Sequence, residues 1–307
     1  VFVVPPRGEN MRIGVLIHAR DTYFQRGDRW LLRFVLAAAR ERGHSVQILQ
    51  GIRSRPELDV LIPHVDLTVR PPEYEDFIGH YRRVLNRGLR DISKRALGGK
   101  ILQRDDDFQG PVILKSDLNF GGRPELRIIP GRRLRADLMA SLRKFPFLRG
   151  LTEGLFWRWT PCLSSRDYRV YPSLRYVPSQ AFHNPNLVAQ PFEPEEEDGL
   201  YALRKWTFLG DAETCSRTMA RAPIVKASNR IPGLGKHVQV PEELREFRRG
   251  VGMDFGKIDF LLRGEKAVVI DVNPTPSIST GGGMRGAARR APLFAQALEH
   301  WMEDSSK

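Results

Sequence analysis

Short hydrophobic runs alternate with amphipathic segments in the first third of the chain. Residues 12–18 (RIGVLIH) form a continuous apolar run, which predicts a strand buried on both faces. A segment with apolar residues at helical spacing follows and ends at Gly43, a common residue just after a helix. The expected order is strand 12–18, helix 28–42, strands 45–49 and 59–65, and a mostly helical stretch 73–94. This order predicts a small open α/β unit with parallel strands.

The rest of the chain has a different pattern, in which short strands are separated by longer irregular stretches. The expected strands are 111–115, 187–192 and 200–208, and the expected helices are 241–249 and 287–302. Residues 134–158 are helical or irregular and lead into an aromatic cluster of Phe145, Phe147, Phe156, Trp157 and Trp159. Such a cluster is usually core or a helix–helix seam, and an exposed platform for bases or a partner is the alternative. The acidic run 193–198 is expected to be a solvated loop.

Two apolar runs near the end of the chain carry the most informative polar residues. They flank the turn-like residues 263–265 and predict a β-hairpin. Asp271 and Asn273 are two residues apart and therefore point to one face of the second strand. If the hairpin turns at residues 264–265, Asp259 lies opposite Asp271. Two carboxylates and an amide suit Mg²⁺, which keeps several waters and bridges to phosphates. The alternative is a set of solvated polar residues at the strand ends.

The composition restricts the class of protein. The 307 residues carry a formal net charge of +13, with 41% hydrophobic and 28% charged residues, which is ordinary for a globular protein apart from the charge. The charge favours an anionic partner such as a nucleotide, and the scattered arginines argue against nucleic acid as the main ligand. No signal peptide and no apolar run of roughly 18 residues is present. Cys162 and Cys215 lack metal-ligand spacing, and we expect a cytoplasmic protein without disulfides.

A lysine at the end of an expected strand offers the second half of a phosphate site. Lys115 ends the run PVILK and is followed by Gly121 and Gly122. A strand-end lysine beside a glycine-containing loop can place an ammonium and several backbone N–H groups around phosphate oxygens. The pattern is common on its own, and its value comes from the carboxylate hairpin downstream. No GxGxxG follows the first strand, so a dinucleotide there has no support.

Together, PVILKSDLNFGG and the downstream GKIDFLLRGEKAVVIDVNPTPS resemble the ATP-grasp superfamily, in the manner of the D-alanine–D-alanine ligases. The resemblance covers roughly residues 90–285. It implies an α/β (α+β ATP-grasp) fold, in which a small N-terminal open α/β domain precedes two α+β lobes that clamp ATP. The expected parts are a leader at 1–10, unless Met11 is the true start, the N-terminal domain at 11–92, and lobes at about 93–188 and 189–307.

The resemblance assigns roles to individual residues. It implies that Lys115 touches the ATP phosphates and that Gly121 and Gly122 cover them. The upstream family lysine corresponds to Lys94 in preference to Lys100, and the hinge residue near adenine to Gln190. A glutamate among residues 193–197 would hold the ribose. The implied metal ligands are Asp259, Asp271 and Asn273, for Mg²⁺ as one or two ions or for Mn²⁺ as a substitute. Lys257 stands at a family arginine position and keeps the charge without the two-pronged donor set, while Lys226 and Arg217 could reach the γ-phosphate.

The implied reaction is ATP- and Mg²⁺-dependent activation of a carboxylate as an acyl phosphate, followed by attack of an amine or similar nucleophile. Arg20, just past the first strand, is a candidate anchor for the substrate carboxylate because ligands gather at the carboxyl ends of strands in open α/β sheets. We expect ATP and a small carboxylate or amino-acid-like molecule as partners, and a homodimer stays open. The alternatives are an ATP-grasp kinase for a small acceptor, a nucleotide-binding protein without turnover, and a basic RNA-binding module.

Overall fold

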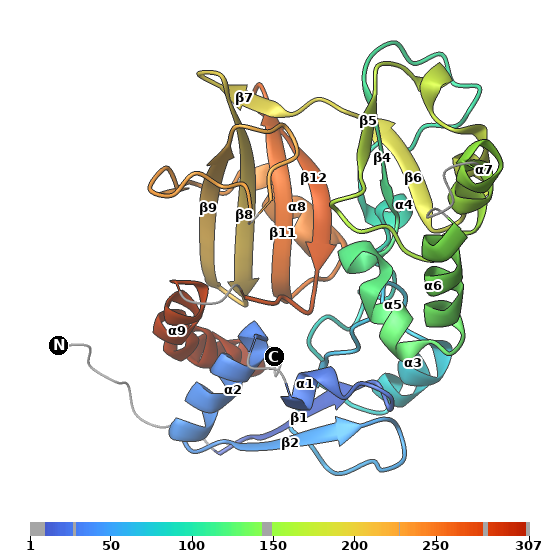
Figure 1. Ribbon diagram of the computed structural model, residues 1–307. Helices are drawn as coiled ribbons and strands as arrows, with labels where there is room; N and C mark the ends of the chain where they lie inside the picture. The colour runs from blue at the N-terminus through green and yellow to red at the C-terminus, as the bar shows by residue number, and fades with distance from the viewer. Residues whose placement is uncertain (1–9, 27–28, 143–148, 227, 279–281, 305–307) are drawn as a thin grey trace.

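The computed structural model describes residues 10–26, 29–142, 149–226, 228–278 and 282–304. Within these ranges the chain forms three sheets with helices around them, in the mixed α/β architecture that the sequence predicts (Figure 1). The N-terminal unit lies at one end of the molecule, and the two other sheets stand side by side above it (Figure 1).

The N-terminal unit is a parallel sheet in the order β2-β1-β3, as expected. Its strands are β1 (Arg12–Ile17), β2 (Ser45–Gln50) and β3 (Val60–Pro63), and its helices are α1 (Tyr23–Arg26), α2 (Leu31–Glu41) and α3 (Pro72–Gly79). Alternate side chains of β1 reach two different cores, because successive residues of a strand point to opposite faces. Val15 packs in a cluster with Leu32 of α2, and Leu16 packs in a cluster with Phe77 of α3.

The C-terminal helix α9 (Gly282–Asp304) returns to the N-terminal unit. It lies beside α2 (Figure 1), and Phe294 and Leu298 belong to the same buried cluster as Leu32. Glu299 fixes this contact by accepting hydrogen bonds from Arg42 at 2.5 Å and 2.7 Å. Neither α9 nor another described helix combines the length and the apolar character that a membrane crossing needs.

The expected helix over residues 73–94 is wrong for most of its length. Only α3 and the short α4 (Lys94–Leu97) are helical, and the chain between them makes isolated bridges of Val84 with Leu61 and of Asp91 with Val69. Helix α3 ends at Gly79, and Asn86, further along the non-helical stretch, has a left-handed φ of 54°. Its side chain bonds the start of a distant strand instead of its own segment. A tertiary contact therefore overrides the local preference.

Two antiparallel sheets make up the rest of the structure. The smaller has the order β5-β4-β6, and the larger has the order β10-β9-β8-β11-β12 with β7 paired to β8. The strands of the first are β4 (Val112–Ser116), β5 (Arg169–Tyr171) and β6 (Leu187–Pro191). Those of the second are β7 (Glu195–Glu197), β8 (Leu200–Leu209), β9 (Ala212–Ala220), β10 (Lys236–His237), β11 (Phe255–Arg263) and β12 (Lys266–Asn273), with α8 (Glu242–Gly250) beside them. These two sheets agree with the expected pair of lobes, while the exact boundaries stay predictions.

The acidic run expected to be a solvated loop is in part a strand. Glu195 lies in β7, its side chain is only 9% exposed, and it accepts a hydrogen bond from Arg204 at 2.7 Å. It also accepts from the backbone N–H of Leu262 at 2.8 Å. A buried carboxylate needs such partners, and here they come from β8 and β11, which the sequence does not place beside residue 195. β9 was not expected either.

The aromatic cluster is divided between core and surface. Its described members lie on α7 (Arg149–Trp159), which follows α5 (Arg123–Ile128) and α6 (Arg132–Leu142). Phe156 and Trp157 are buried in one core with Leu114, as the core interpretation predicts, whereas Trp159 is 58% exposed. Phe145 and Phe147 lie outside the described residues.

Asn86 connects the N-terminal unit to the larger sheet, and its replacement tests this connection. Its Oδ1 accepts from the N–H groups of Asp254 at 2.7 Å and Phe255 at 2.9 Å, and its Nδ2 donates to the carbonyl of Phe255 at 2.7 Å. Asn86→Gly keeps the positive φ but loses these bonds, and it should lower the free energy of unfolding by about 2 kcal/mol. Asn86→Ala should cost about 1 kcal/mol more because of its backbone. Urea unfolding measures both, with the exposed Gln103→Ala as a neutral control; unchanged stability of Asn86→Ala would contradict the connection.

Candidate functional site

A cavity of about 530 Å³ lies between the two antiparallel sheets. Its walls come from β4 and β6 on one side and from β8, β11 and β12 on the other. Nine of the residues proposed from the sequence line this cavity together: Lys94, Lys115, Gly121, Gln190, Lys226, Lys257, Asp259, Asp271 and Asn273. Gly122 is not among its lining residues, and Arg20 lines a different cavity. Residues up to 179 positions apart thus meet at one place.

A bulge in the hairpin of β11 and β12 brings the two aspartates together. Phe260 pairs with Val269, but the register then shifts by one residue, so that Ile270 is left over and Asp259 pairs with Asp271. Without this shift Asp259 would face Ile270, and Asp271 would point to the other side of the sheet. The predicted opposition of the two carboxylates is confirmed, and the bulge is the reason for it.

Each aspartate forms an ion pair with a lysine. Lys257 Nζ lies 2.9 Å from Asp259 Oδ2, and Lys94 Nζ lies 2.9 Å from Asp271 Oδ1. Burial alone would raise the pKa of Asp271, but attraction by Lys94 and Lys257 lowers it below its usual value. Burial would likewise lower the pKa of both lysines, and the aspartates raise it instead. Asp271, Lys94 and Lys257 are therefore charged at neutral pH.

Two further lysines face the same carboxylates, and neither forms an ion pair with any residue in the described ranges. Lys115 is only 5% exposed, and burial together with repulsion by Lys94 lowers its pKa to about 7, against the pull of Asp271 and Asp117. Lys205 pairs in register with Asp259 from β8. Burial, which outweighs the attraction of Asp259, lowers the pKa of Lys205. Sequence reasoning missed Lys205, because only the order of β8 next to β11 reveals its position. The cavity therefore has more cationic than anionic side chains.

The residues expected to hold Mg²⁺ fit the ion in part. Asp259 Oδ1 is buried and has no hydrogen-bond partner, which leaves it free for a cation. Asn273 Oδ1 already accepts from the N–H of Thr275 at 2.8 Å and from its hydroxyl at 3.1 Å. In the part of the chain that the structure describes, no three His, Cys, Asp or Glu side chains gather as a metal site. The two carboxylates suit an ion that takes its other ligands from phosphate and water.

The loop after Lys115 takes a shape that depends on its two glycines. Phe120, Gly121 and Gly122 have φ of 47°, 71° and 82°, in the left-handed region that favours glycine. A Cβ on Gly121 would lie 2.5 Å from the carbonyl oxygen of Leu163, and one on Gly122 would lie 2.9 Å from Leu118 Cδ1. The loop thus runs close to its neighbours, and Gly121 presents its backbone to the cavity.

The contacts expected for adenine and ribose involve Gln190 and a glutamate among residues 193–197. Gln190 lines the cavity, but its Nε2 donates to the carbonyl of Gly98 at 2.5 Å and so holds the end of α4. Among the candidate glutamates, Glu195 and Glu197 pair with Arg204 and Arg217. Only Glu193 of the run lines the cavity, where it pairs with Arg263 at 3.1 Å.

Comparisons with known proteins add a similarity at the level of structure. No protein-family model matches the chain, and no curated protein matches it. Among solved structures, D-alanine–D-alanine ligase from Bacillus anthracis is similar at 11% identity with a TM-score of 0.45, covering 96% of this chain and 97% of that one. A RimK domain ATP-grasp protein from Sphaerobacter thermophilus is similar at 12% identity with a TM-score of 0.48, covering 94% and 99%. The ATP-grasp ligase PsnB, complexed with precursor peptide PsnA2 and AMPPNP, is similar at 10% identity with a TM-score of 0.48, covering 95% and 98%. Each of these three similarities covers at least 94% of both chains.

Proposed function

We propose that this protein is an ATP-grasp ligase that activates a carboxylate with ATP and Mg²⁺ and joins it to an amine or a similar nucleophile. The observation that carries the proposal is the surplus of positive charge in the inter-sheet cavity. Four lysines, Lys94, Lys115, Lys205 and Lys257, line this cavity together with the two aspartates of the hairpin, and the other carboxylate among the lining residues, Glu193, pairs with Arg263. A polyphosphate would supply the missing negative charge.

The lysines and the glycine loop would bind the phosphates. Lys115 and the backbone around Gly121 line one wall, and Lys205 and Lys226 line the other, so a phosphate chain between them is contacted from both sheets. Buried cations at fixed positions stabilise the charge that spreads over a transferring phosphoryl group, because no water has to reorganise around it. Gln190 and Glu193 also line the cavity and would lie near adenine and ribose.

Asp259, Asp271 and Asn273 would hold Mg²⁺. When bound, the ion supplies charge neutralisation for the phosphate oxygens. Asp259 would use its unpartnered Oδ1, and Asn273 would have to release Thr275. Lys94 and Lys257 are paired to these aspartates and are thereby held beside the phosphate positions.

The chemistry follows from what these groups can stabilise. A carboxylate oxygen of the substrate attacks the γ-phosphorus, the bond to the β-phosphate oxygen breaks, and ADP leaves. The nucleophile then attacks the carbonyl carbon of the acyl phosphate, and inorganic phosphate leaves. Lys257, next to Asp259, would neutralise the oxyanion that forms in this second step.

Aspartate variants test the metal assignment through binding. Mg²⁺ should tighten ATP binding to the native protein by about tenfold or more, measured by calorimetry with Mg²⁺ and with EDTA. In Asp259→Asn and Asp271→Asn this effect of Mg²⁺ should disappear, while ATP binding in EDTA persists or strengthens because one negative charge is gone. The exposed Asp105→Asn should behave like the native protein. A full Mg²⁺ effect in Asp271→Asn would contradict the assignment.

Lys115 predicts how nucleotide binding depends on pH. Its pKa of about 7 means that it is mostly neutral at pH 8 in the free protein, whereas a bound phosphate favours the charged form. Binding should therefore take up a proton, and ADP affinity should fall as pH rises from 7.5 to 9, by at most about tenfold per unit. Calorimetry in buffers of different ionisation enthalpy counts the proton. Lys115→Met should bind more weakly and lose this uptake, whereas Lys100→Met should retain it; equal uptake in both variants would refute the phosphate role.

Product analysis tests the reaction itself. The protein is incubated with ATP, Mg²⁺ and pooled small acids and amines, and products are identified by mass. A ligase yields ADP, phosphate and an amide or related adduct that depend on both substrates. A phosphorylated acceptor without released phosphate would identify a kinase instead. Lys257→Met should lower adduct formation at least about a hundredfold if this lysine stabilises the oxyanion.

A further inference from the structure

One hydroxyl group connects the proposed metal ligand Asn273 to the N-terminal unit. Thr275 Oγ1 lies 3.1 Å from Asn273 Oδ1 and 2.9 Å from Asp66 Oδ1, and both of these oxygens are hydrogen-bond acceptors. A hydroxyl carries one proton, so Thr275 donates to one of the two oxygens at a time. Asp66 follows β3 and lies 209 positions before Thr275 in the chain. The acceptor that competes with Asn273 for this proton therefore comes from the N-terminal unit.

The amide oxygen of Asn273 has two lone pairs, and Thr275 can occupy both. The backbone N–H of Thr275 donates to this oxygen at 2.8 Å, and the hydroxyl is the second donor, at 3.1 Å. The backbone fixes the direction of the N–H group, whereas the hydroxyl proton can rotate about the bond to Cβ. A cation at Asn273 Oδ1 therefore needs only the hydroxyl proton to turn away.

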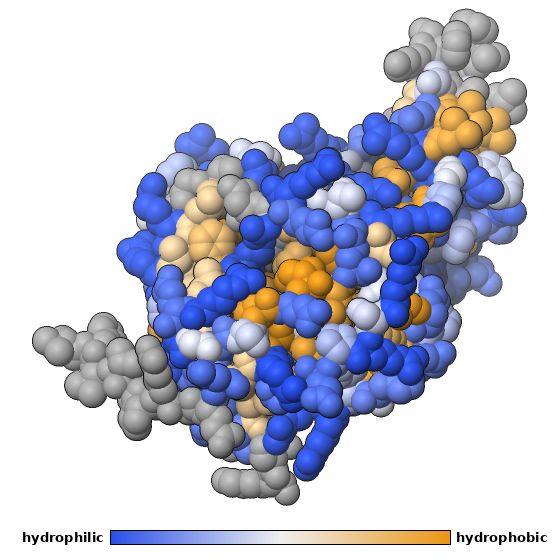
Figure 2. All heavy atoms as spheres, turned by 90° about the horizontal axis from the view of Figure 1, so that it is seen from below, coloured by the Kyte–Doolittle hydropathy of each residue, from blue (hydrophilic) through white to orange (hydrophobic). Residues whose placement is uncertain are grey.

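Asp66 is a buried carboxylate that depends on donors from the protein. Hydrophilic side chains cover most of the lower face of the molecule, where water solvates them (Figure 2), but Asp66 is only 4% exposed. Its Oδ2 accepts from Arg127 at 2.9 Å, and its Oδ1 accepts from Thr275 and, at 3.4 Å, from Asn119. A charged oxygen holds a hydroxyl proton more strongly than a neutral amide oxygen does. Ionised Asp66 should therefore keep the proton of Thr275 away from Asn273.

The carboxyl group of Asp66 is ionised in mildly basic solution. Burial raises its pKa to about 7, against the pull of Arg127 and of the hydrogen bond from Thr275. Repulsion by Asp21 and Glu125 adds to the rise. At pH 8.5 the group is above its pKa, so it is charged and acts as an acceptor.

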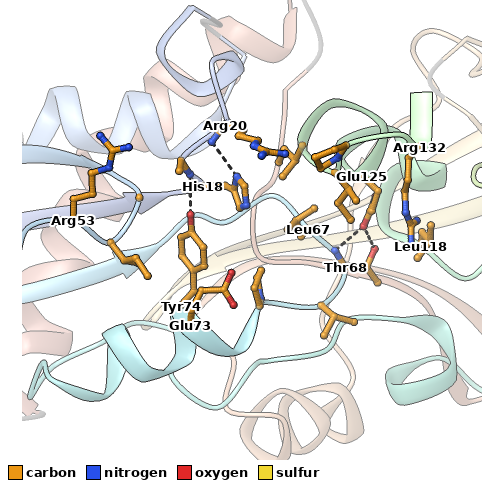
Figure 3. Close-up of a pocket in the computed structure, with 18 residues that line it drawn as sticks. His18, Arg20, Arg53, Leu67, Thr68, Glu73, Tyr74, Leu118, Glu125 and Arg132 are labelled. Carbon is orange, nitrogen blue, oxygen red and sulfur yellow. Dashed lines mark hydrogen bonds between the residues drawn. The ribbon is translucent and has the colours of Figure 1, made fainter. Parts of the chain in front are cut away.

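The segment that carries Asp66 also contacts the glycine loop. Asn119 lines the inter-sheet cavity, its Nδ2 donates to Asp66, and its N–H donates to Thr68 Oγ1 at 2.8 Å. Thr68 lines a second cavity, of about 540 Å³, at the carboxyl ends of β1 and β2, where its hydroxyl donates to Glu125 (Figure 3). Arg20 lines this second cavity as well. The N-terminal unit thus holds both the glycine loop and the loop that follows β12.

We propose that Asp66 is a positioning residue for the metal site, because it holds the hydroxyl proton of Thr275 and so leaves one lone pair of Asn273 free for Mg²⁺. This proposal rests on the proposed function, since it assumes that Asn273 holds the ion. Asp66 itself does not line the inter-sheet cavity and acts only through Thr275. One hydrogen bond from the N-terminal unit would therefore set how readily the cleft takes up the metal.

Asp66→Asn reverses the direction of this hydrogen bond. Arg127 donates to the group at position 66, so the amide oxygen should face Arg127 and the NH₂ group should face Thr275 Oγ1. The NH₂ group then donates to Thr275, and the hydroxyl proton turns to Asn273. Calorimetry at pH 8.5 gives the ratio of the ATP dissociation constant in EDTA to that in Mg²⁺, in which a general change of nucleotide binding cancels. This ratio should fall about fivefold or more in Asp66→Asn.

Two substitutions of Thr275 distinguish positioning from a merely structural role. Thr275→Ser keeps the hydroxyl and should show the native ratio. Thr275→Val removes the competing donor, so its ratio should be native or higher, and adding Asp66→Asn to it should change the ratio by less than about twofold. A structural defect caused by Asp66→Asn would instead lower the ratio by the same factor in both backgrounds.

A matched control and the native protein complete the experiment. Asp254→Asn removes a partly buried carboxylate at another contact of the N-terminal unit with the larger sheet, and it should keep the native ratio. If Mg²⁺ does not affect ATP binding to the native protein, the metal assignment fails and this proposal fails with it. If the native protein shows the effect, the metal site stands, and the role of Asp66 is refuted by a full ratio in Asp66→Asn, by an equal fall in the Thr275→Val background, or by a lowered ratio in Thr275→Val alone.

Discussion

The arrangement of charges in the cavity depends on two carboxylates, Asp259 and Asp271, that lie opposite each other on neighbouring strands. Their side chains project from paired positions of neighbouring strands, where like charges are destabilising unless cations intervene. Lys257 comes from β11 itself and Lys94 from α4, so the pair is neutralised by side chains from both halves of the cleft. The smaller and the larger sheet are therefore tied together at the site itself.

The lysine surplus has a cost for the folded protein. Lys115 is buried and Lys205 is partly buried, neither forms an ion pair within the described residues, and burial lowers the pKa of both. Buried ammonium groups without counter-ions destabilise a fold, and they persist where a function uses them. The same low polarity makes each lysine more effective toward an anion that enters the cleft. Burial of the lysines thus both destabilises the fold and strengthens the proposed binding of phosphate.

The N-terminal unit is held to this cleft by contacts that are polar as well as apolar. Asn86 bonds the start of β11, and α9 carries the end of the chain back onto α2. Thr68 bridges the two cavities, since its hydroxyl donates to Glu125 and accepts from the N–H of Asn119, next to the glycine loop.

Local patterns along the chain were enough to predict the parallel N-terminal sheet, the hairpin with Asp259, Asp271 and Asn273, and Lys115 with its glycine loop. The resemblance of the motifs added Lys94, Gln190, Lys226 and Lys257, which also line the cleft. Strand periodicity depends on neighbouring residues only, and the hairpin partners are separated by a short turn. Tertiary structure decided what depends on distant segments: the bulge that turns both aspartates to one face, Lys205 beside Asp259, Glu195 buried against Arg204, and Arg20 in a separate cavity. It also decided the path of residues 80–93, which the sequence predicts as helix: α3 ends at Gly79, and Asn86 bonds partners 168 and 169 residues further along the chain. Burial and charge pairing are set by the neighbours that the fold supplies, and a single sequence does not show which segments those will be.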